Sequence, residues 1–235
     1  MSQVTGVQTC ALPILRISSL LAVALQISGE QSTTLGRSDV WVFERYGLFW
    51  AVIEYELTIH RLPEFNEKII IETEATSYNK FFCYRNFSFL NEKGEVLVEI
   101  HSTWVLMDKE TRKIDRVLDE IVDPYESEKV SKISRPHKFL KLEQFGETRQ
   151  IVYPVRFSAL DMNGHVNNAK YYDWAADMVD FDFRKEHQPK HVFIKYNHEI
   201  LYGEEIKALM SWKDDVSHHN FNDGSTQIEI HWGKI

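Results

Sequence analysis

The stretch Gly94-Glu95-Val96-Leu97-Val98-Glu99-Ile100-His101 recurs, without a gap, as Gly224-Ser225-Thr226-Gln227-Ile228-Glu229-Ile230-His231. Each copy follows a turn that begins at an asparagine, Asn91 in the first and Asn222 in the second. Two further pairs recur upstream in the same order, Ile53-x-Tyr55 with Ile194-x-Tyr196 and Glu67-Lys68-Ile69 with Glu204-Glu205-Ile206. Because matches in the same order rarely arise by chance, the sequence predicts two similar halves.

Both copies of the repeat lie among segments that are rich in Ile, Val, Phe and Tyr and are bounded by turn residues. We expect strands near 49–60, 67–78, 80–90 and 95–107, and again near 150–157, 191–201, 204–212, 214–220 and 225–233. Apolar spacing predicts one long helix in each half, at 18–35 before Gly36 and at 167–183. The propensities alone therefore indicate an α+β protein with two similar halves.

Composition excludes several classes of function. The 235 residues are 43% hydrophobic and 26% charged, which is ordinary for a globular protein. The net charge of −8 argues against a nucleic-acid partner. No apolar run reaches the roughly 18 residues of a membrane span, so we expect a cytoplasmic protein. The basic residues within 123–148, which we interpret as a linker, could dock an acidic partner or simply be solvated.

Residues 4–14, with the sequence VTGVQTCALPI, resemble the translation of a sequencing-adapter oligonucleotide. We therefore expect residues 1–14 to be non-native and exclude them from reasoning about the fold. The first half then lacks the strand that should precede its helix.

A second stretch, Asp161-Met162-Asn163-Gly164-His165-Val166-Asn167-Asn168, concentrates hydrogen-bonding groups directly before the second helix. Asn167 and Asn168 are good N-cap residues, so His165 should lie beside free N–H groups and a positive dipole end. Val166, Asn167 and Asn168 could then supply donors to an oxyanion. An ordinary Asx turn before a capped helix is an alternative, and the chemistry alone leaves both interpretations open.

The motif resembles the signature of acyl-acyl-carrier-protein (acyl-ACP) thioesterases: an acid, any residue, Asn, any residue, His-Val-Asn-Asn, then an aromatic helix. The matching positions are Asp161, Asn163, His165, Val166, Asn167, Asn168, Tyr171 and Trp174. The family also has a Glu on a following strand, where this chain has Glu199. The resemblance covers the chain from about residue 15 onward. It implies a tandem (double) hot-dog fold, in which each half is a long helix wrapped by an antiparallel β-sheet.

The resemblance also implies that Asp161, Asn163, His165 and Glu199 hydrolyse a thioester. Glu199 would be the general base or would position the base, and His165 would polarise the carbonyl or move a proton. Asn163 would orient water or substrate, and Asp161 would hold Asn163 or His165. Plant-type members have a Cys after the Glu, whereas this chain has Ile200, so a Cys–His acyl-enzyme is not available there. By strand alternation alone, Glu199 would be only a carboxylate on a solvent face.

We expect the two halves to have different functions. Residues 15–122 would form a first hot-dog, residues 123–148 a linker, and residues 149–235 a second hot-dog that carries the catalytic site. The first half lacks the catalytic groups, so we expect it to bind the acyl chain against Trp50, Phe82 or Trp104.

The implied substrate is an acyl chain on the phosphopantetheine of acyl carrier protein, and the implied product is a free fatty acid. We expect no cofactor and no metal, since the adjacent His218 and His219 have poor geometry for joint ligation. Two alternatives remain: an acyl-CoA thioesterase, and a non-catalytic acyl-binding or regulatory protein. The chain is expected to be a monomer or a homodimer.

The adapter interpretation makes a prediction about the gene. Resequencing the genomic locus should reveal, upstream of Leu15, codons for a β-strand and a turn in place of residues 4–14. An intact genomic copy of residues 4–14 would show that this interpretation is wrong.

Overall fold

The computed structural model describes residues 16–131, 137–140, 147–161 and 164–235. The expectations for residues 1–14 and for Asn163 therefore lie outside the described residues. The chain divides into two compact units. Unit 1 comprises residues 20–55 and 60–136, and unit 2 comprises residues 16–19, 56–59 and 137–235. The change from one unit to the other at residue 137 falls within the segment predicted to be a linker.

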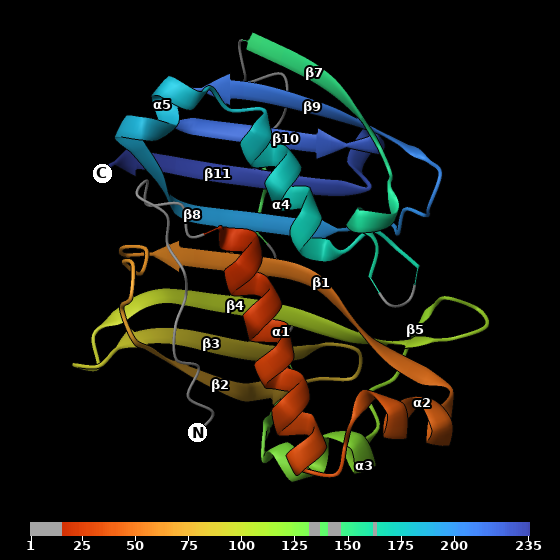
Figure 1. Cartoon of the computed structure of the whole chain (residues 1–235). Helices are drawn as coiled ribbons and strands as arrows, with labels where there is room; N and C mark the ends of the chain where they lie inside the picture. The colour runs from red at the N-terminus through yellow and green to blue at the C-terminus, as the bar shows by residue number, and fades with distance from the viewer. Residues whose placement is uncertain (1–15, 132–136, 141–146, 162–163) are drawn as a thin grey trace. The chain divides into compact units, whose positions relative to one another are not determined.

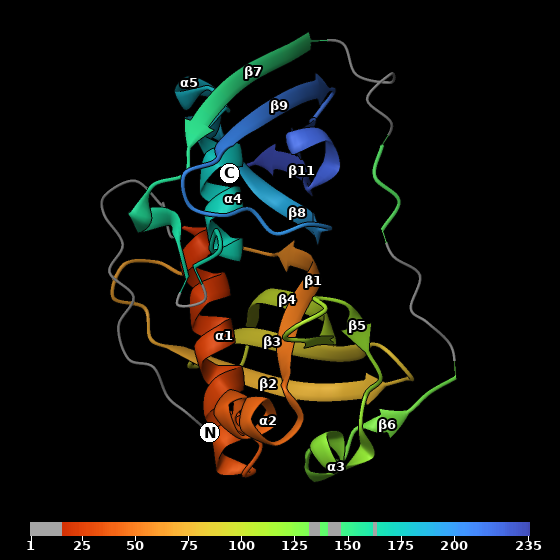
Figure 2. The same ribbon diagram turned by 90° about the vertical axis from the view of Figure 1, so that its right-hand side faces the viewer.

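Unit 1 is a long helix lying on an antiparallel sheet (Figures 1 and 2). The elements are α1 (Ile17–Thr34), β1 (Leu48–Ile59), β2 (Ile69–Tyr78), β3 (Cys83–Asn91) and β4 (Val96–Asp108), of which the first residues of α1 and the last of β1 count with unit 2. The strand order is β6-β2-β3-β4-β1, and the short β6 (Glu128–Lys129) pairs in parallel with β2 at the edge. β5 (Ile114–Asp115) pairs with β4. The core between helix and sheet includes Leu21, Ala24, Phe87, Phe89 and Ile100.

Short helices that the sequence pattern did not predict close one end of unit 1. α2 (Asp39–Tyr46) begins at Ser38, whose Oγ accepts a hydrogen bond from the Trp41 N–H at 3.2 Å, and ends at Gly47 in the left-handed region. α3 (Asp119–Val122) and η1 (Asp123–Tyr125) follow β5. Together they bury a cluster made by Val42, Leu48, Tyr78, Leu106, Ile121 and Val122. The predicted linker 123–148 is therefore partly folded onto unit 1.

Unit 2 repeats the arrangement of one helix on an antiparallel sheet (Figure 1). Its strands are β7 (Glu147–Pro154), β8 (His187–Tyr196), β9 (Glu205–Lys213), β10 (Val216–Phe221) and β11 (Thr226–Lys234). Their order is β8-β11-β10-β9-β7. Two short 3₁₀ turns accompany them, η3 (Phe157–Ala159) and η4 (Asn222–Gly224). Helix packing on a sheet in both units confirms the predicted α+β, double hot-dog fold.

The helix expected at 167–183 is in fact two helices, α4 (Asn168–Asp177) and α5 (Phe181–Glu186). At the break, the N–H groups of Met178 and Val179 bond to carbonyls three residues back, at 3.2 Å each. The Arg149 side chain donates to the Met178 carbonyl at 2.9 Å, which satisfies a carbonyl that a continuous helix would use. Asp180 has extended backbone angles and starts α5. Apolar periodicity continued through the break, so the sequence pattern concealed it.

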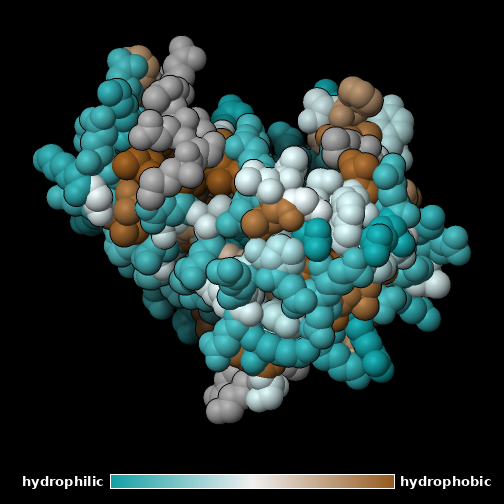
Figure 3. Space-filling view, turned by 90° about the horizontal axis from the view of Figure 1, so that it is seen from below, coloured by the Kyte–Doolittle hydropathy of each residue, from teal (hydrophilic) through white to brown (hydrophobic). Residues whose placement is uncertain are grey.

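The surface fits the charged composition. On the face seen in Figure 3, hydrophilic side chains predominate and the hydrophobic ones lie in smaller groups. None of the helices in the described ranges has the length and apolar character needed to cross a membrane.

A buried carboxylate fastens part of the predicted linker to unit 2. Glu229, on β11, accepts hydrogen bonds from the Leu140 N–H at 2.9 Å and from the rings of His137 and His231 at 3.1 and 2.8 Å. The His137 ring stacks on Phe193, with centroids 3.6 Å apart. Burial alone would raise the pKa of Glu229, but the hydrogen bonds outweigh it and lower the pKa to about 2. Residues 137–140 are therefore part of the folded unit.

This carboxylate predicts a pH-dependent contribution to stability. Glu229→Gln should lower the free energy of unfolding near pH 7 by on the order of 3 kcal/mol, because the pKa falls from 4.5 to about 2 on folding. Since the folded pKa is the lower one, the contribution is full above pH of about 5 and disappears as the pH falls toward 2. Urea denaturation across this range measures it. Glu99→Gln, at the equivalent and more exposed position of the repeat, is the control, and an equal loss from both variants would contradict the prediction.

Candidate functional site

The loop before α4 is closed by its own hydrogen bonds. Leu160 and Val166 form an antiparallel bridge, and the Asp161 N–H donates to the His165 carbonyl at 2.8 Å. The Asp161 carboxylate accepts from the His165 N–H at 3.2 Å. Gly164 has φ of 80°, a conformation that a residue with a Cβ rarely adopts. Asp161 therefore fixes the backbone of His165.

A second set of contacts brings this loop to Glu199. His165 forms an antiparallel bridge with Leu201, and the Val166 N–H donates to the carbonyl of Ile200 at 2.9 Å. Ile200 is buried, so this segment is held in place by packing as well. His165 Nε2 lies 3.7 Å from Glu199 Oε2, with 19% of the histidine side chain and 40% of the glutamate side chain exposed. The structure thus brings Asp161 to the backbone of His165 and the His165 ring to Glu199, and the catalytic role of the three residues stays a prediction.

Glu199 is not on a strand, contrary to the expectation for 191–201. β8 ends at Tyr196, and the N–H groups of Asn197 and His198 both donate to the Ser225 carbonyl, at 2.8 and 3.2 Å. Because these two successive N–H groups share one carbonyl, the regular pairing of β8 with β11 ends before Glu199. The strand-alternation argument for a carboxylate on a sheet's solvent face therefore does not apply.

The start of α4 differs in detail from the prediction. Asn167 is the N-cap, as expected, and its Oδ1 accepts from the Ala169 N–H at 2.9 Å. The prediction that Val166 and Asn167 offer free N–H groups to an oxyanion is wrong. Val166 donates to Ile200, and Asn167 donates to the Ala159 carbonyl at 2.8 Å. Among the three predicted donors, only the Asn168 N–H bonds to no other residue in the described ranges.

Two tyrosines that line this region were not selected as functional from the sequence. The Tyr196 hydroxyl donates to the Asn168 carbonyl at 2.8 Å and so ties the end of β8 to the first turn of α4. Tyr171 is buried on α4, and burial raises the pKa of its hydroxyl, with a further contribution from Glu204 and Glu199. It therefore stays neutral beside the site. From the sequence, the only indication of Tyr171 was that the family signature includes an aromatic helix at this place.

The side chains predicted to bind an acyl chain lie in unit 1. Trp50 packs against the cluster beneath α2 and α3, as does Cys83. Trp104 is directly opposite Cys83 in the β3–β4 pairing and donates from Nε1 to Ser102 Oγ at 2.8 Å. Phe82 precedes Cys83 in the turn from β2, where its N–H donates to Asn79 Oδ1 at 3.0 Å. All three are partly buried, and their role stays a prediction.

His218 and His219 point to opposite faces of the unit 2 sheet. His218 pairs with Glu229 on the face that residues 137–140 cover, whereas His219 pairs with Ile228 on the face toward α4. In the described ranges, His, Cys, Asp and Glu side chains form no group of three or more that could hold a metal ion. These histidines therefore do not converge on one ion.

The acyl-ACP thioesterase N-terminal domain family matches residues 12–125, and the C-terminal domain family matches residues 142–234. The chloroplastic oleoyl-acyl carrier protein thioesterase of Coriandrum sativum is 26% identical over 210 residues, which is 83% of this chain and 57% of the plant protein. The chain thus spans little more than half the length of such curated relatives.

Solved structures extend the likeness over the whole chain. A protein of Lactobacillus plantarum assigned as an oleoyl thioesterase is 31% identical, with a TM-score of 0.88 over 100% of this chain and 94% of that one. The 12:0-ACP thioesterase of Umbellularia californica shares the fold at 16% identity, with a TM-score of 0.84 over 100% and 97% of the two chains. On the two domain matches and the 31% identity over nearly the entire length, this chain belongs to the acyl-ACP thioesterase family.

Proposed function

We propose that this protein hydrolyses the thioester of acyl-ACP and releases the free fatty acid. The observation that carries the proposal is the pairing of His165 with Glu199 at the amino end of α4, in a chain of this family. A module that only binds acyl chains has no need of an imidazole and a carboxylate placed together beside a helix dipole.

The separation of the two groups suits activation of a water molecule. At 3.7 Å, His165 Nε2 and Glu199 Oε2 are too far apart for a direct hydrogen bond but within reach of one shared water. Glu199 takes a proton as the water oxygen attacks the thioester carbon. The tetrahedral intermediate then collapses, the C–S bond breaks, and the sulfur leaves with a proton delivered from Glu199 or His165.

The oxyanion formed in this step needs donors, and the helix start can supply one. The Asn168 N–H lies at the first position of α4, where the helix dipole favours negative charge. In this scheme His165 contributes a second donor from its ring. Asp161 acts through the backbone of His165, which it holds at 3.2 Å, and Asn163 orients water or substrate.

The substrate, partner and setting follow from the same proposal. The partner is acyl carrier protein, whose phosphopantetheine carries the acyl chain, and the reaction requires no further cofactor or metal. We propose a cytoplasmic location, although the plant relatives are named as chloroplastic. The active form would be a monomer or a homodimer.

Acyl-CoA is the alternative substrate, because it presents the same phosphopantetheine thioester. Turnover of the purified protein on carrier-bound and CoA-bound acyl chains of several matched lengths separates the two. A higher kcat/KM with the carrier-bound form supports the proposal, a preference for CoA favours the alternative, and no turnover of either would favour a binding protein.

Removing either member of the pair should impair hydrolysis without unfolding the protein. We expect His165→Ala and Glu199→Ala each to lower kcat/KM by about 10²–10⁴-fold, the usual contribution of a positioned acid or base. His191→Ala and Glu186→Gln, at exposed positions elsewhere in unit 2, are matched controls that should retain activity. If Glu199→Ala kept wild-type activity while its melting temperature was unchanged, Glu199 would not be the base.

The water route also predicts that no acyl-enzyme forms. Ile200 replaces the cysteine of plant-type members, and burial raises the pKa of the Cys83 thiol in unit 1 to about 12, so that it is not a thiolate at neutral pH. Thiol alkylation should leave hydrolysis largely unchanged, and single-turnover reaction in ¹⁸O-water should label only the product acid. A trapped acyl adduct, or label in the Glu199 or Asp161 carboxylate, would contradict direct attack by water.

A further inference from the structure

The last residue of β8, Tyr196, joins the two segments of unit 2 that carry the His165–Glu199 pair. Its hydroxyl donates to the carbonyl of Asn168, in the first turn of α4, at 2.8 Å. Asn168 follows His165 in the chain, and Glu199 follows Tyr196, at the same spacing in both cases. A side chain that makes no contact with the substrate thus connects the backbone beside one member of the pair to the backbone beside the other.

A backbone contact connects the same two segments at a second point. The Val166 N–H donates to the Ile200 carbonyl at 2.9 Å, and His165 lies opposite Leu201 in an antiparallel bridge. Glu199 therefore lies in the chain between two points of attachment, Tyr196 on one side and Ile200 on the other. One attachment alone would let the segment pivot, whereas two of them hold it at a fixed distance from α4.

The residues between these attachments are also held on the side away from α4. The N–H groups of Asn197 and His198 share the Ser225 carbonyl, and Asn197 Nδ2 donates to the Gly224 carbonyl at 2.7 Å. These contacts attach the segment to the turn before β11. They do not set its distance from α4, which depends on the bonds made by Tyr196 and Ile200.

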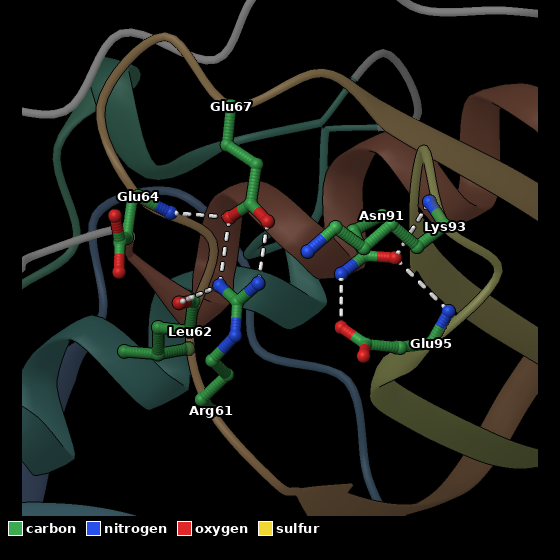
Figure 4. A network of polar contacts seen from close by, with 7 residues as sticks. All are labelled: Arg61, Leu62, Glu64, Glu67, Asn91, Lys93 and Glu95. Atoms are coloured by element: carbon green, nitrogen blue, oxygen red, sulfur yellow. Dashed lines mark hydrogen bonds and ion pairs between the residues drawn. The ribbon is translucent and has the colours of Figure 1, made fainter.

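The corresponding loop of unit 1 is held in a different way. In the sequence repeat Glu67 corresponds to Glu204, so the loop after β1 is the counterpart of the loop after β8. There Arg61 forms two hydrogen bonds with the Glu67 carboxylate, one of them from Nη1 to Oε2 at 2.7 Å (Figure 4). Glu67 in turn accepts from the Glu64 N–H at 2.8 Å. The loop in the half without the catalytic motif thus closes on itself, whereas the loop that carries Glu199 is bonded to a helix.

The first turn of α4 is fixed around the carbonyl that Tyr196 contacts. The Ala169 N–H donates to Asn167 Oδ1 at 2.9 Å, so the peptide between Asn168 and Ala169 is bonded at both its N–H and its carbonyl. The Asn168 N–H, the oxyanion donor of the proposed mechanism, belongs to the preceding peptide. The Tyr196 ring packs edge-on against Tyr171, with centroids 5.9 Å apart, which limits the directions in which the hydroxyl can point.

We propose that Tyr196 is a positioning residue for thioester hydrolysis. Its hydroxyl holds the Glu199 segment at the distance from α4 at which Glu199, His165 and the Asn168 N–H act on one thioester group. The hydroxyl itself neither contacts the substrate nor exchanges a proton in the reaction. This inference rests on the proposed function, because the reaction defines what has to be positioned.

Loss of the hydroxyl should slow the chemical step more than it weakens binding. Tyr196→Phe keeps the ring and its packing and removes one hydrogen bond. A small misplacement of a reacting group lowers the rate steeply, and a misplaced pair acts in the transition state rather than in substrate binding. We therefore expect kcat to fall by about 10-fold, while KM changes by less than about 2-fold.

Tyr153 provides a matched control on the same helix. Its hydroxyl, on β7, donates to the Trp174 carbonyl of α4 at 3.3 Å, beyond the first turn. Tyr153→Phe removes the same kind of bond and should leave kcat unchanged. Both variants are assayed across pH on the acyl-ACP that wild type hydrolyses fastest. Equal losses of kcat would overturn the proposal, because they would reflect a general loosening of α4. A changed shape of the pH profile in Tyr196→Phe would also overturn it, because the hydroxyl would then move a proton itself.

Amide hydrogen exchange tests the geometry without catalysis. In Tyr196→Phe, but not in Tyr153→Phe, the N–H groups of Val166 and Ala169 should exchange about 5-fold faster than in wild type, the effect of losing one hydrogen bond. Amides of β10 and β11 should keep their protection.

The two measurements separate this role from the proposed function. If wild type hydrolyses no acyl thioester but Tyr196→Phe alone speeds this exchange, the proposed function fails and the attachment by Tyr196 is confirmed. If wild type hydrolyses acyl-ACP and Tyr196→Phe keeps its kcat, the positioning role is overturned and the function stands. A fall in kcat without faster exchange at Val166 or Ala169 would likewise overturn the positioning role, because the hydroxyl would then act on the reaction directly.

Discussion

The hydrogen bond from the Val166 N–H to the Ile200 carbonyl is the contact on which the site depends. It joins two loops that are far apart in the sequence, and the neighbouring bridge between His165 and Leu201 sets their register. This pairing sets His165 opposite Leu201, two residues after Glu199, and the imidazole and the carboxylate then lie 3.7 Å apart. The same bond explains why the Val166 N–H cannot serve an oxyanion. Different backbone groups therefore position the His165–Glu199 pair and stabilise the oxyanion.

The internal repeat shows how one sequence pattern acquires two environments. Glu99 and His101 on β4 correspond to Glu229 and His231 on β11. In unit 1 the Glu99 side chain is 41% exposed and meets His60 at 3.0 Å, whereas in unit 2 the Glu229 side chain is only 1% exposed. The difference arises because residues 137–140 cover Glu229, and nothing in the strand sequence itself distinguishes the two. Burial of a repeated residue thus depends on a segment outside the repeat.

The sequence predicted those helices and strands that depend on patterns within their own residues. Helix α1, its termination at Gly36, and the positions of most strands follow from apolar periodicity and turn residues. Helix α2 was missed although Ser38 and Gly47 are good caps, because its eight residues give too little periodicity. At the break between α4 and α5 the Met178 carbonyl accepts from Arg149, and where the chain leaves β8 the N–H groups of Asn197 and His198 share the Ser225 carbonyl. Both partners are distant in sequence, and so a local pattern could not reveal them.

The same limit applies to the site. The motif and the family resemblance together identified Asp161, His165 and Glu199 as neighbours, and the structure places them together. They could not tell which N–H groups of Val166, Asn167 and Asn168 remain available, because that depends on the carbonyls of Ala159 and Ile200. Residue identity predicts which groups are present, whereas backbone pairing decides which of them are used.

The two interiors differ in how they accommodate a buried basic side chain. In unit 2, His219 is fully buried, with Nε2 3.0 Å from Ser217 Oγ, and burial lowers its pKa to about 3, so the ring is neutral at physiological pH. A histidine can thus avoid the desolvation of a charge by losing its proton. Arg85 in unit 1 has no such option, since its guanidinium stays protonated at any pH at which the protein is folded. The groups that meet this guanidinium are neutral: Nη1 donates to Gln31 Oε1 at 2.6 Å and to Thr73 Oγ1 at 2.8 Å, and its carbon lies 5.5 Å from the centre of the Tyr125 ring. Unit 2 thus accommodates a buried basic side chain by loss of its proton, whereas unit 1 surrounds one with neutral acceptors and an aromatic ring.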